Sequence, residues 1–185
     1  TEVADFRMRM FNADGSEGEM CGNASRCIGK YVYEKGLSKK RYITLETLAG
    51  IKSLSLYVNS DNKVESVTVD MGEPVLDPLR IPVAYDRDVV KTPISTNFGI
   101  FEITAVSMGN PHAVVFVDDV AHFEIEKYGP LFENHERFPQ RVNTEFVQVV
   151  SKNEAIMRVW ERGSAETWAC GTGTCATVMA CILNG

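Results

Sequence analysis

The chain has 185 residues, of which 44% are hydrophobic and 24% charged, with a formal net charge of −6. These values are typical of a globular protein with one large or two small domains and a core that needs no cross-links. The acidic balance and the lack of a long Lys/Arg run argue against nucleic-acid and membrane-surface partners. No apolar run reaches the length of a membrane span.

Five cysteines occur, namely Cys21, Cys27, Cys170, Cys175 and Cys181. An odd count in a chain of ordinary composition does not indicate a disulfide-rich secreted scaffold. We therefore expect a reducing, cytoplasmic setting.

The first half begins with an alternating segment. Residues 6–11 (FRMRMF) alternate apolar and basic side chains, which predicts a strand. A loop with Cys21 follows, and from Ala24 apolar residues recur at helical spacing, which predicts a helix ending near Gly36. Three further alternating runs predict strands, with a hairpin-like turn at 59–62. These runs are YITLETL, IKSLSLYV and KVESVTVDM.

The middle of the chain is rich in proline. Residues 72–95 contain four of the seven prolines, and proline disfavours helix interiors and central strands. We therefore divide the chain into domains at 1–80 and 81–185. Strands are predicted again in GIFEITAVSM, HAVVFVDD, NTEFVQVV and EAIMRVWERG. The last run, GTGTCATVMACILNG at 171–185, is apolar nearly all round, which predicts a helix buried on most sides.

The two halves repeat one order, a strand, a Gly-rich loop with a cysteine, and a helix. Glu17 and Glu166 each lie four residues before a cysteine. Asn12 and Glu161 each lie nine residues before one. A helix buried all round implies a strongly curved sheet about it. The predicted fold class is therefore α+β, with two similar domains facing one another.

Cys21 and Cys170 each directly precede a predicted helix. That position lies at the positive end of the helix dipole, beside unpaired backbone N–H groups, and can lower a thiol pKa from about 8.5 to between about 3.5 and 7.5. The same N–H groups would bind a carboxylate. Two such ends would place one sulfur on each side of an α-carbon. A thiolate base and a thiol acid could then invert that stereocentre, with the dipoles stabilising the carbanion.

Other interpretations of the cysteines are weaker. A single cysteine is more often a small buried hydrophobe, and we expect helix packing for Cys27, Cys175 and Cys181. Zinc frameworks favour shorter spacings and paired histidines, so no metal is expected. The GTGT segment lacks the ending of a phosphate-binding loop. A disulfide between Cys21 and Cys170 would be an inactivated state rather than a structural cross-link.

Four motifs, FNADGSEGEMCGNASRC, MGNPH, VNTEFVQV and ERGSAETWACGTGTCA, occur in this order. Together they closely resemble the bacterial diaminopimelate epimerases over essentially the whole chain. The resemblance implies an isomerase that needs neither pyridoxal phosphate nor another cofactor. Such an enzyme interconverts LL- and meso-diaminopimelate in lysine and peptidoglycan-precursor biosynthesis. The implied fold is two pseudo-symmetric domains, each a curved, barrel-like sheet around a central helix, with the active site in the interdomain cleft.

The resemblance assigns roles to the residues around the cysteines. Cys21 and Cys170 match the two catalytic thiols of the family. The groups that match those holding the reacting carboxylate at the helix starts are Gly22, Asn23, Gly171 and Thr172. His112 and Glu161 match residues that lie near the thiols in the family, and His112 could assist proton handling.

A second group of residues matches those that recognise the substrate, especially its distal amino-acid end: Asn12, Asn110, Asn143, Glu161 and Arg162. Arg162 can bind a carboxylate through two hydrogen bonds. Glu161 can accept from an ammonium group, and asparagine offers neutral donors and acceptors. Without the resemblance, the asparagines would be interpreted as ordinary turn residues.

The sequence departs from the family pattern at both ends and at two internal positions. The family's upstream Gly-Leu-Gly-Asn-Asp-Phe segment and the strands after the second helix have no counterpart, so both domains lack expected strands and we expect a longer protein. Ala24 and Ala165 stand where the family usually has glycine.

Two alternatives remain open. A related racemase could act on proline or histidine, but Glu161, Arg162 and the asparagines favour a substrate with two amino-acid ends. A catalytically inactive binding protein of the same fold would not need both thiols. The expected partner is a small amino-acid substrate, with a homodimer as an option, and neither nucleic acid nor membrane.

Overall fold

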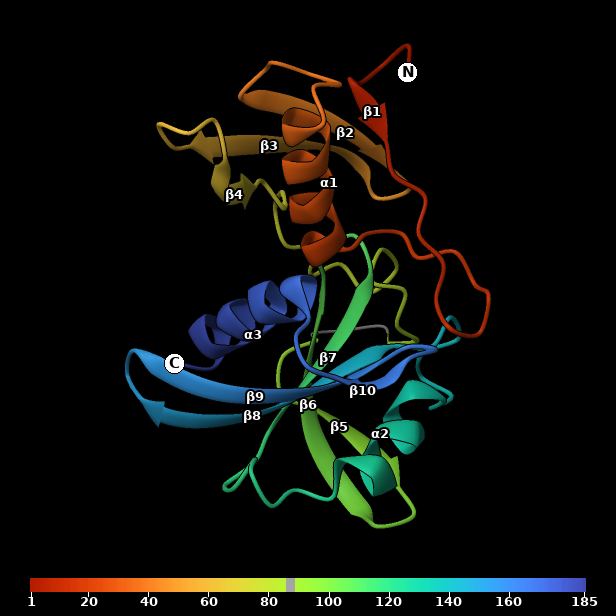
Figure 1. The fold of residues 1–185 in the computed structure, drawn as a ribbon. Coiled ribbons are helices and arrows are strands. Elements are labelled where there is room, and N and C mark those ends of the chain that lie inside the picture. Colours follow the sequence, from red (N-terminus) through yellow and green to blue (C-terminus); the bar gives the residue numbers. More distant parts are fainter. Residues whose placement is uncertain (86–88) are drawn as a thin grey trace. The chain divides into compact units, whose positions relative to one another are not determined.

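The computed structural model describes residues 1–85 and 89–185. These residues form two compact units, Thr1–Gly72 and Glu73–Gly185 (Figure 1). The sequence places the domain boundary between residues 80 and 81. The structure divides the chain eight residues earlier, between Gly72 and Glu73. Val75 already belongs to the second unit, because its backbone N–H and C=O both bond to Ser107. Within the proline-rich segment, residues 86–88 lie outside the described part.

The first unit is a mixed sheet with one helix against it (Figure 1). The strand order is β1-β2-β3-β4, and β1 and β2 are parallel while the other neighbours are antiparallel. The elements are β1 (Phe6–Arg7), α1 (Gly22–Glu34), β2 (Tyr42–Thr47), β3 (Gly50–Val58) and β4 (Val64–Val69). The alternation in β2 and β3 buries Ile43, Leu45 and Leu54 completely. Helix α1 packs closely at Gly29, where a Cβ would contact Leu54 and Val67.

The second unit contains a six-stranded mixed sheet in the order β10-β9-β8-β7-β6-β5. Only β7 and β8 pair in parallel among its neighbouring strands in the described residues. The first elements are β5 (Thr92–Thr96), β6 (Gly99–Ser107), β7 (Pro111–Phe116) and α2 (Ile125–Glu133). The remaining elements are β8 (Asn143–Ser151), β9 (Glu154–Glu161), β10 (Ala165–Thr167) and α3 (Gly171–Asn184).

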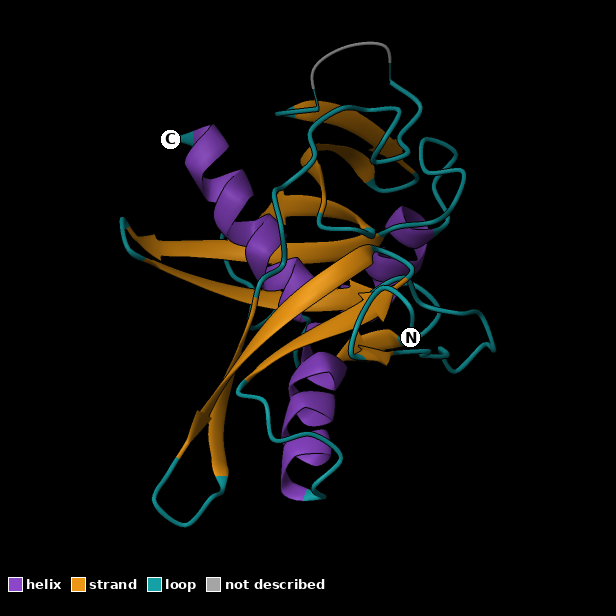
Figure 2. Cartoon of the chain, turned by 90° about the horizontal axis from the view of Figure 1, so that it is seen from above, coloured by secondary structure: helices purple, strands orange, loops and turns teal. Residues whose placement is uncertain are grey.

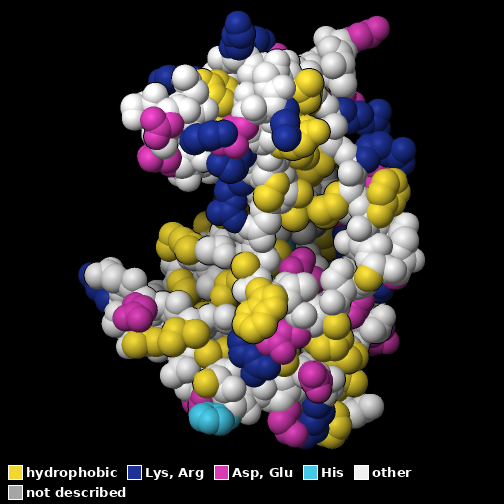
Figure 3. All heavy atoms as spheres, viewed as in Figure 1, with side chains coloured by type: hydrophobic (Ala, Val, Ile, Leu, Met, Phe, Trp, Pro, Cys, Tyr) yellow, Lys and Arg dark blue, Asp and Glu magenta, His cyan; other side chains and the backbone are white. Residues whose placement is uncertain are grey.

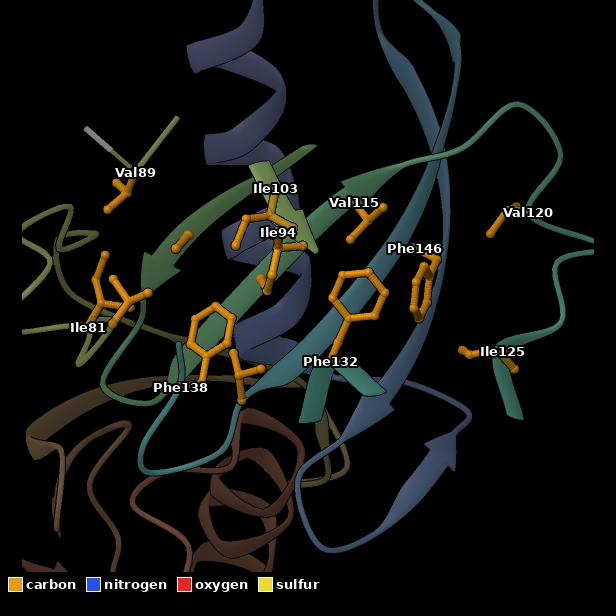
Figure 4. Close-up of a cluster of buried hydrophobic side chains, with 14 residues drawn as sticks. Ile81, Val89, Ile94, Ile103, Val115, Val120, Ile125, Phe132, Phe138 and Phe146 are labelled. Atoms are coloured by element: carbon orange, nitrogen blue, oxygen red, sulfur yellow. The ribbon is translucent and has the colours of Figure 1, made fainter. Parts of the chain in front are cut away.

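Alternation along β8 separates the two sides of this unit. Phe146 packs edge-on against Phe132 of α2, with ring centroids 5.6 Å apart, in an aliphatic and aromatic core (Figure 4). The adjacent Glu145 points to the opposite side, where its Oε1 lies against Gly173 at the start of α3. Helix α3, which ends at the C-terminus in Figure 2, packs on β6, β7 and β8. One strand therefore supplies apolar packing beneath α2 and polar groups beneath the start of α3.

The predicted elements are largely confirmed. The helix after Cys21, the turn at 59–62 and the alternating strands all form near their expected bounds. The strand at 6–11 is shorter than predicted, since β1 contains only Phe6 and Arg7. The sequence analysis missed β5 and α2, which contain Pro93 and Pro130 respectively. Strand β5 tolerates proline because it lies at the edge of its sheet.

Three expectations about packing are wrong. Helix α3 is not buried all round, because Val178 and Ile182 are 56% and 69% exposed. Cys27 is exposed rather than packed, because α1 contacts its sheet through the opposite stripe that includes Gly29 and Val32. The described sheets are open four- and six-stranded sheets, so neither closes into a barrel.

The surface carries charges of both signs. Lys and Arg side chains lie among Asp and Glu over the face drawn in Figure 3, which agrees with the modest net charge. Among the described residues, no helix is both long and apolar enough to cross a membrane.

Candidate functional site: two matched thiol sites

Each cysteine of the repeat follows a hairpin with the same register. In the first unit Phe11 pairs antiparallel with Glu17. In the second unit Trp160 pairs antiparallel with Glu166. In both units the first partner lies ten residues before its cysteine and the second partner lies four residues before it. The predicted internal repeat therefore extends to strand pairing.

An arginine and a glutamate clamp each hairpin. Arg9 and Arg158 both lie twelve residues before their cysteine. In the first unit the Arg9 Nε and Nη2 atoms donate to the two Glu17 carboxylate oxygens at 2.9 and 3.0 Å. The same atoms of Arg158 donate to Glu166 at 2.7 and 3.0 Å. Two parallel charge-assisted bonds hold each pair in a fixed orientation.

The helix starts repeat the same hydrogen bonds. Cys21 is the N-cap of α1 and its Sγ accepts from the Ala24 N–H at 3.4 Å. Cys170 is the N-cap of α3 and its Sγ accepts from the Gly173 N–H at 3.3 Å. Four residues after each cysteine, a hydroxyl donates to the cysteine carbonyl at 2.9 Å, from Ser25 and Thr174. Both thiols are therefore held at a helix N-terminus, as the sequence predicts.

The first residues of both helices lie where the resemblance placed them. Gly22 and Asn23 open α1 and Gly171 and Thr172 open α3. Gly22 and Thr172 are buried, and Asn23 accepts a hydrogen bond from the Arg26 guanidinium. A helix start of this kind suits a carboxylate, because its N–H groups and dipole both favour negative charge.

The two sulfurs lie in different surroundings. Cys21 is half-buried, whereas Cys170 is only 6% exposed. Burial raises the pKa of the Cys170 thiol from 9.0 to about 12, and negative charge at Glu145 and Glu161 adds to this effect. Hydrogen bonds from Thr172 and Gly173 act in the opposite direction. The expectation that a helix start lowers the thiol pKa is therefore wrong for Cys170, because desolvation and two carboxyl groups outweigh the dipole.

A buried chain of hydrogen bonds leads from Cys170 into the sheet. The Thr172 Oγ1 lies 3.3 Å from the Cys170 Sγ and accepts from the Asn110 Nδ2 at 3.3 Å. The Asn110 Oδ1 lies 3.0 Å from the His112 Nε2. The His112 Nδ1 lies 2.7 Å from the Glu145 Oε1. The structure thus brings three of the predicted residues beside one thiol.

Three of the predicted recognition residues, Asn143, Glu161 and Arg162, gather near the end of β9. Asn143 is buried, and its Oδ1 accepts from the Arg162 backbone N–H at 2.7 Å. The Thr167 hydroxyl donates to the Glu161 carboxylate, and the Arg162 guanidinium donates to the Gln140 carbonyl at 3.1 Å. Because Asn143 pairs with His112 between β8 and β7, this group adjoins the chain that leads to Cys170.

Asn12 lies in the first unit, in the hairpin before Cys21. Its Nδ2 donates to the Ser16 Oγ at 3.0 Å, and its backbone N–H donates to the Ser16 carbonyl at 2.8 Å. It therefore lies at the turn of the first hairpin, where a turn residue is expected.

Glu145 and the two arginines are not among the residues predicted from the sequence. Glu145 is an acidic residue in β8 directly before the apolar pair Phe146 and Val147, and a charged side chain at an inward position signals a buried contact. The arginine signal was the equal spacing to the repeated glutamates. Among the described residues, no group of three or more His, Cys, Asp or Glu side chains has the arrangement of a metal site.

Comparison with known proteins identifies relatives across the whole chain. A family model described as diaminopimelate epimerase matches residues 1–76 and 104–185. A curated diaminopimelate epimerase of Agathobacter rectalis is 66% identical and covers 100% of this chain. One from Acetivibrio thermocellus is 55% identical with the same coverage. The chain spans about two thirds of these relatives, 67% and 66% of their lengths.

Solved structures share the fold at low identity. A hydroxyproline epimerase from Agrobacterium vitis matches with a TM-score of 0.73 and 18% identity, over 97% of this chain and 56% of that chain. A probable proline racemase from Agrobacterium radiobacter matches with a TM-score of 0.70 and 17% identity, over 94% and 56% of the two chains. At this identity the likeness concerns the fold alone.

Proposed function

The chain belongs to the diaminopimelate epimerase family, and from that premise we propose a function. The protein that contains this chain converts LL-diaminopimelate to meso-diaminopimelate without a cofactor. The observation that carries the proposal is the duplicated thiol site, in which hairpin register, Arg–Glu clamp and helix cap all recur. Inverting one carbon requires two proton-transfer groups of similar chemistry, and a duplicated thiol provides them.

The proposed reaction begins with removal of the α-proton by one thiolate. The C–H bond breaks, its electron pair delocalises into the α-carboxylate, and a new S–H bond forms. The other thiol then donates its proton to the opposite face of the carbon and becomes a thiolate. The N-termini of α1 and α3 supply N–H groups and dipoles that would stabilise the negative charge in the transition state.

Cys170 suits the acid role in the resting protein. Because burial and neighbouring carboxyl groups raise its pKa to about 12, it carries its proton at neutral pH. Cys21 would then act as the base in the same direction, and the two would exchange roles in the reverse reaction. A hydroxyl within reach of the Cys170 sulfur provides a donor when that thiol becomes a thiolate.

Selection of a substrate with two amino-acid ends would rest on the polar group at the end of β9. Arg162 can bind the distal carboxylate and Glu161 the distal ammonium. Asn143 would hold this turn in place through its bond to the Arg162 backbone N–H. We place the reaction in the cytoplasm, where reducing conditions keep both thiols free.

The test is solvent-deuterium incorporation at the α-carbon of LL-diaminopimelate, with a reductant present and no cofactor added. We expect incorporation together with formation of the meso isomer. Proline and hydroxyproline serve as controls for the wider fold, and neither should exchange its α-proton. Exchange of proline but not of diaminopimelate would instead assign a proline-type racemase, and no exchange of either would favour a binding protein.

A further inference from the structure

We propose that Glu145 and His112 together hold one proton more than an ionised carboxylate beside a neutral imidazole. This extra proton orients a hydrogen-bond chain whose last donor, the Thr172 hydroxyl, points at the Cys170 sulfur. Glu145 would be a positioning residue that acts through His112, Asn110 and Thr172. The inference rests on the proposed function only for its purpose, which is to stabilise Cys170 when it becomes a thiolate.

The surroundings of Glu145 require compensation of its charge. Its side chain is fully buried, its Oε1 lies 2.7 Å from the His112 Nδ1, and its Oε2 has no hydrogen-bond partner among the described residues. A lone buried carboxylate with an unpaired oxygen is costly. Sharing a proton with the buried His112 makes the pair neutral overall, and 2.7 Å is typical of a charge-assisted bond.

The other ring nitrogen of His112 also indicates that the Glu145–His112 pair holds an extra proton. His112 Nε2 faces the Asn110 Oδ1 at 3.0 Å, and an oxygen acceptor requires a hydrogen on that nitrogen. Nδ1 also faces an oxygen, on Glu145. One proton must lie between Nδ1 and that carboxylate and a second on Nε2. Glu145 and His112 together then hold one proton more than an ionised carboxylate beside a neutral imidazole.

The direction of the remaining bonds follows from that proton. Asn110 accepts from His112 through Oδ1, so its Nδ2 donates to the Thr172 Oγ1. The Thr172 hydroxyl hydrogen is then available to the Cys170 sulfur 3.3 Å away. If Nε2 lacked its proton, the Asn110 amide would turn over, Thr172 would donate to Asn110, and the Cys170 thiol would donate to Thr172.

Glu145 also lies against the start of α3. An added Cβ at Gly173 would meet the Glu145 Oε1, so this helix start leaves room for the carboxyl group only because residue 173 is glycine. The carboxyl groups of Glu145 from β8 and Glu161 from β9 raise the Cys170 pKa, and His112 from β7 faces Glu145. A proton shared with His112 would reduce the part of this rise that the Glu145 charge supplies.

No proton needs to travel along the chain during the reaction. When Cys170 protonates the carbanion, its S–H bond breaks, the new C–H bond forms, and the sulfur keeps the electron pair as a thiolate. The Thr172 hydroxyl then donates to that thiolate while the Glu145–His112 proton stays in place.

The test measures the alkylation rate of Cys170 by iodoacetamide at one fixed pH, resolved from the other cysteines by peptide mass spectrometry. Thr172→Val removes the last donor, and we expect about a tenfold slower reaction of Cys170, the loss of one hydrogen bond to a charged group. The matched control is Thr174→Val, whose hydroxyl bonds the Cys170 carbonyl rather than the sulfur, and it should leave the rate unchanged. Equal rates in all three proteins would overturn the proposal.

The change in the Cys170 alkylation rate caused by Glu145→Gln tests whether the pair shares a proton. Glutamine can donate to Nδ1 and keep the hydrogen on Nε2, so a neutral pair replaces a neutral pair and the alkylation rate should stay within about twofold. If Glu145 were an uncompensated carboxylate, its removal would favour the thiolate and raise the rate about tenfold or more, which would contradict the proposal.

A measurement on the unaltered protein does not depend on how the variants fold. The ¹⁵N chemical shifts of His112 report which ring nitrogens carry hydrogen, and we expect a hydrogen on Nε2, which faces the Asn110 Oδ1. A bare Nε2 would refute the inference. Neither alkylation nor NMR requires a substrate, so failure of the epimerase assay would leave both results interpretable.

Discussion

Cys21 and Cys170 begin their helices in the same way but lie in different surroundings. Both follow a hairpin clamped by an arginine and a glutamate, and both accept from the backbone N–H three residues on. Only Cys170 is buried, with a pKa raised to about 12 by burial and by two neighbouring carboxyl groups.

The difference teaches that local sequence sets the geometry of a thiol, whereas distant strands set its affinity for a proton. The hairpin, clamp and cap lie within twelve residues of each cysteine, from Arg9 to Ser25 and from Arg158 to Thr174. Glu145 and His112 reach Cys170 from other strands of the sheet.

The largest predicted effect comes from removing either sulfur. Cys21→Ser and Cys170→Ser should each lower kcat/KM for epimerisation at least about a hundredfold, because each removes a proton-transfer group. The double variant should be little worse than either single variant, since the two thiols act as a unit. The measurement is formation of the meso isomer by chiral chromatography.

Cys27→Ser serves as the control for these variants. Its thiol is exposed on the outer face of α1, so activity and thermal stability should match those of the unaltered protein. Retention of full activity by either the Cys21 or the Cys170 variant would rule out the two-thiol mechanism.

The next effect concerns stability at alkaline pH. The folded state holds the pKa of Cys170 near about 12, above its ordinary value of 9.0, so the unfolded chain loses this proton first as pH rises. The stability from the protonated thiol is fully present below about pH 9 and is lost between about 9 and about 12. Its contribution to the slope is about 1.4 kcal/mol per pH unit.

Chemical denaturation across that pH range, on the protein and on Cys170→Ser, isolates this contribution. The serine variant should lose stability less steeply with rising pH than the protein with Cys170. Identical slopes for the two proteins would mean that burial does not hold the Cys170 proton.

Much of this site could be predicted from the sequence because it depends on local spacing. The equal offsets of Glu17 and Glu166 from their cysteines predicted a repeat, and the structure adds matched strand register. The role of Glu145 could not be predicted, since alternation in β8 tells which residues share a face but not which helix covers it. Likewise, the direction of the Cys170 pKa shift depends on carboxyl groups brought in from β8 and β9.

Errors in the predicted fold also arise where a property depends on packing between elements rather than on local sequence. Helical spacing correctly predicted α1, but Cys27 is exposed because the helix packs through the stripe that includes Gly29 and Val32. Proline argued against strands in residues 72–95, although the edge strand β5 accommodates Pro93. No helix was predicted at Ile125–Glu133, where the short helix α2 contains Pro130. The apolar face of α3 with Val178 and Ile182 was interpreted as buried because composition alone does not identify the packed face.

The two clamps should differ in their contribution to stability. Arg158 also donates to the carbonyls of Val120 and Phe123 at 3.2 and 2.8 Å, whereas Arg9 lies over the exposed Phe11 ring. We expect Arg158→Met to lower the free energy of unfolding by about 1–2 kcal/mol, through loss of these partly buried bonds. Arg9→Met should have a smaller effect, because an exposed ion pair contributes little.

Urea denaturation of both variants provides the comparison, and high salt sharpens it. Salt should weaken the exposed Arg9–Glu17 pair while affecting the Arg158 carbonyl bonds less. Equal losses of stability in the two variants would indicate that the clamps act only through their glutamates.

The smallest predicted effect lies at the fifth residue before each cysteine, where the two hairpin turns differ. Ala165 adopts a left-handed φ of 59°, which costs a residue with a Cβ about 1–2 kcal/mol. Glycine removes that strain but loses about 0.4–1 kcal/mol through greater freedom of the unfolded chain. Ala165→Gly should therefore raise stability by about 0.5 kcal/mol, measured as a small rise in Tm.

Ser16 occupies the matching position before Cys21, and its substitution should have the opposite sign. Its hydroxyl donates to Asp14 at 2.5 Å and accepts from Asn12 at 3.0 Å, so Ser16→Gly loses hydrogen bonds and gains unfolded-state freedom. A fall in Tm for Ser16→Gly beside a rise for Ala165→Gly would show that the repeat preserves strand register while each turn solves its backbone geometry differently. A fall in both would mean that Ala165 is not strained by its φ.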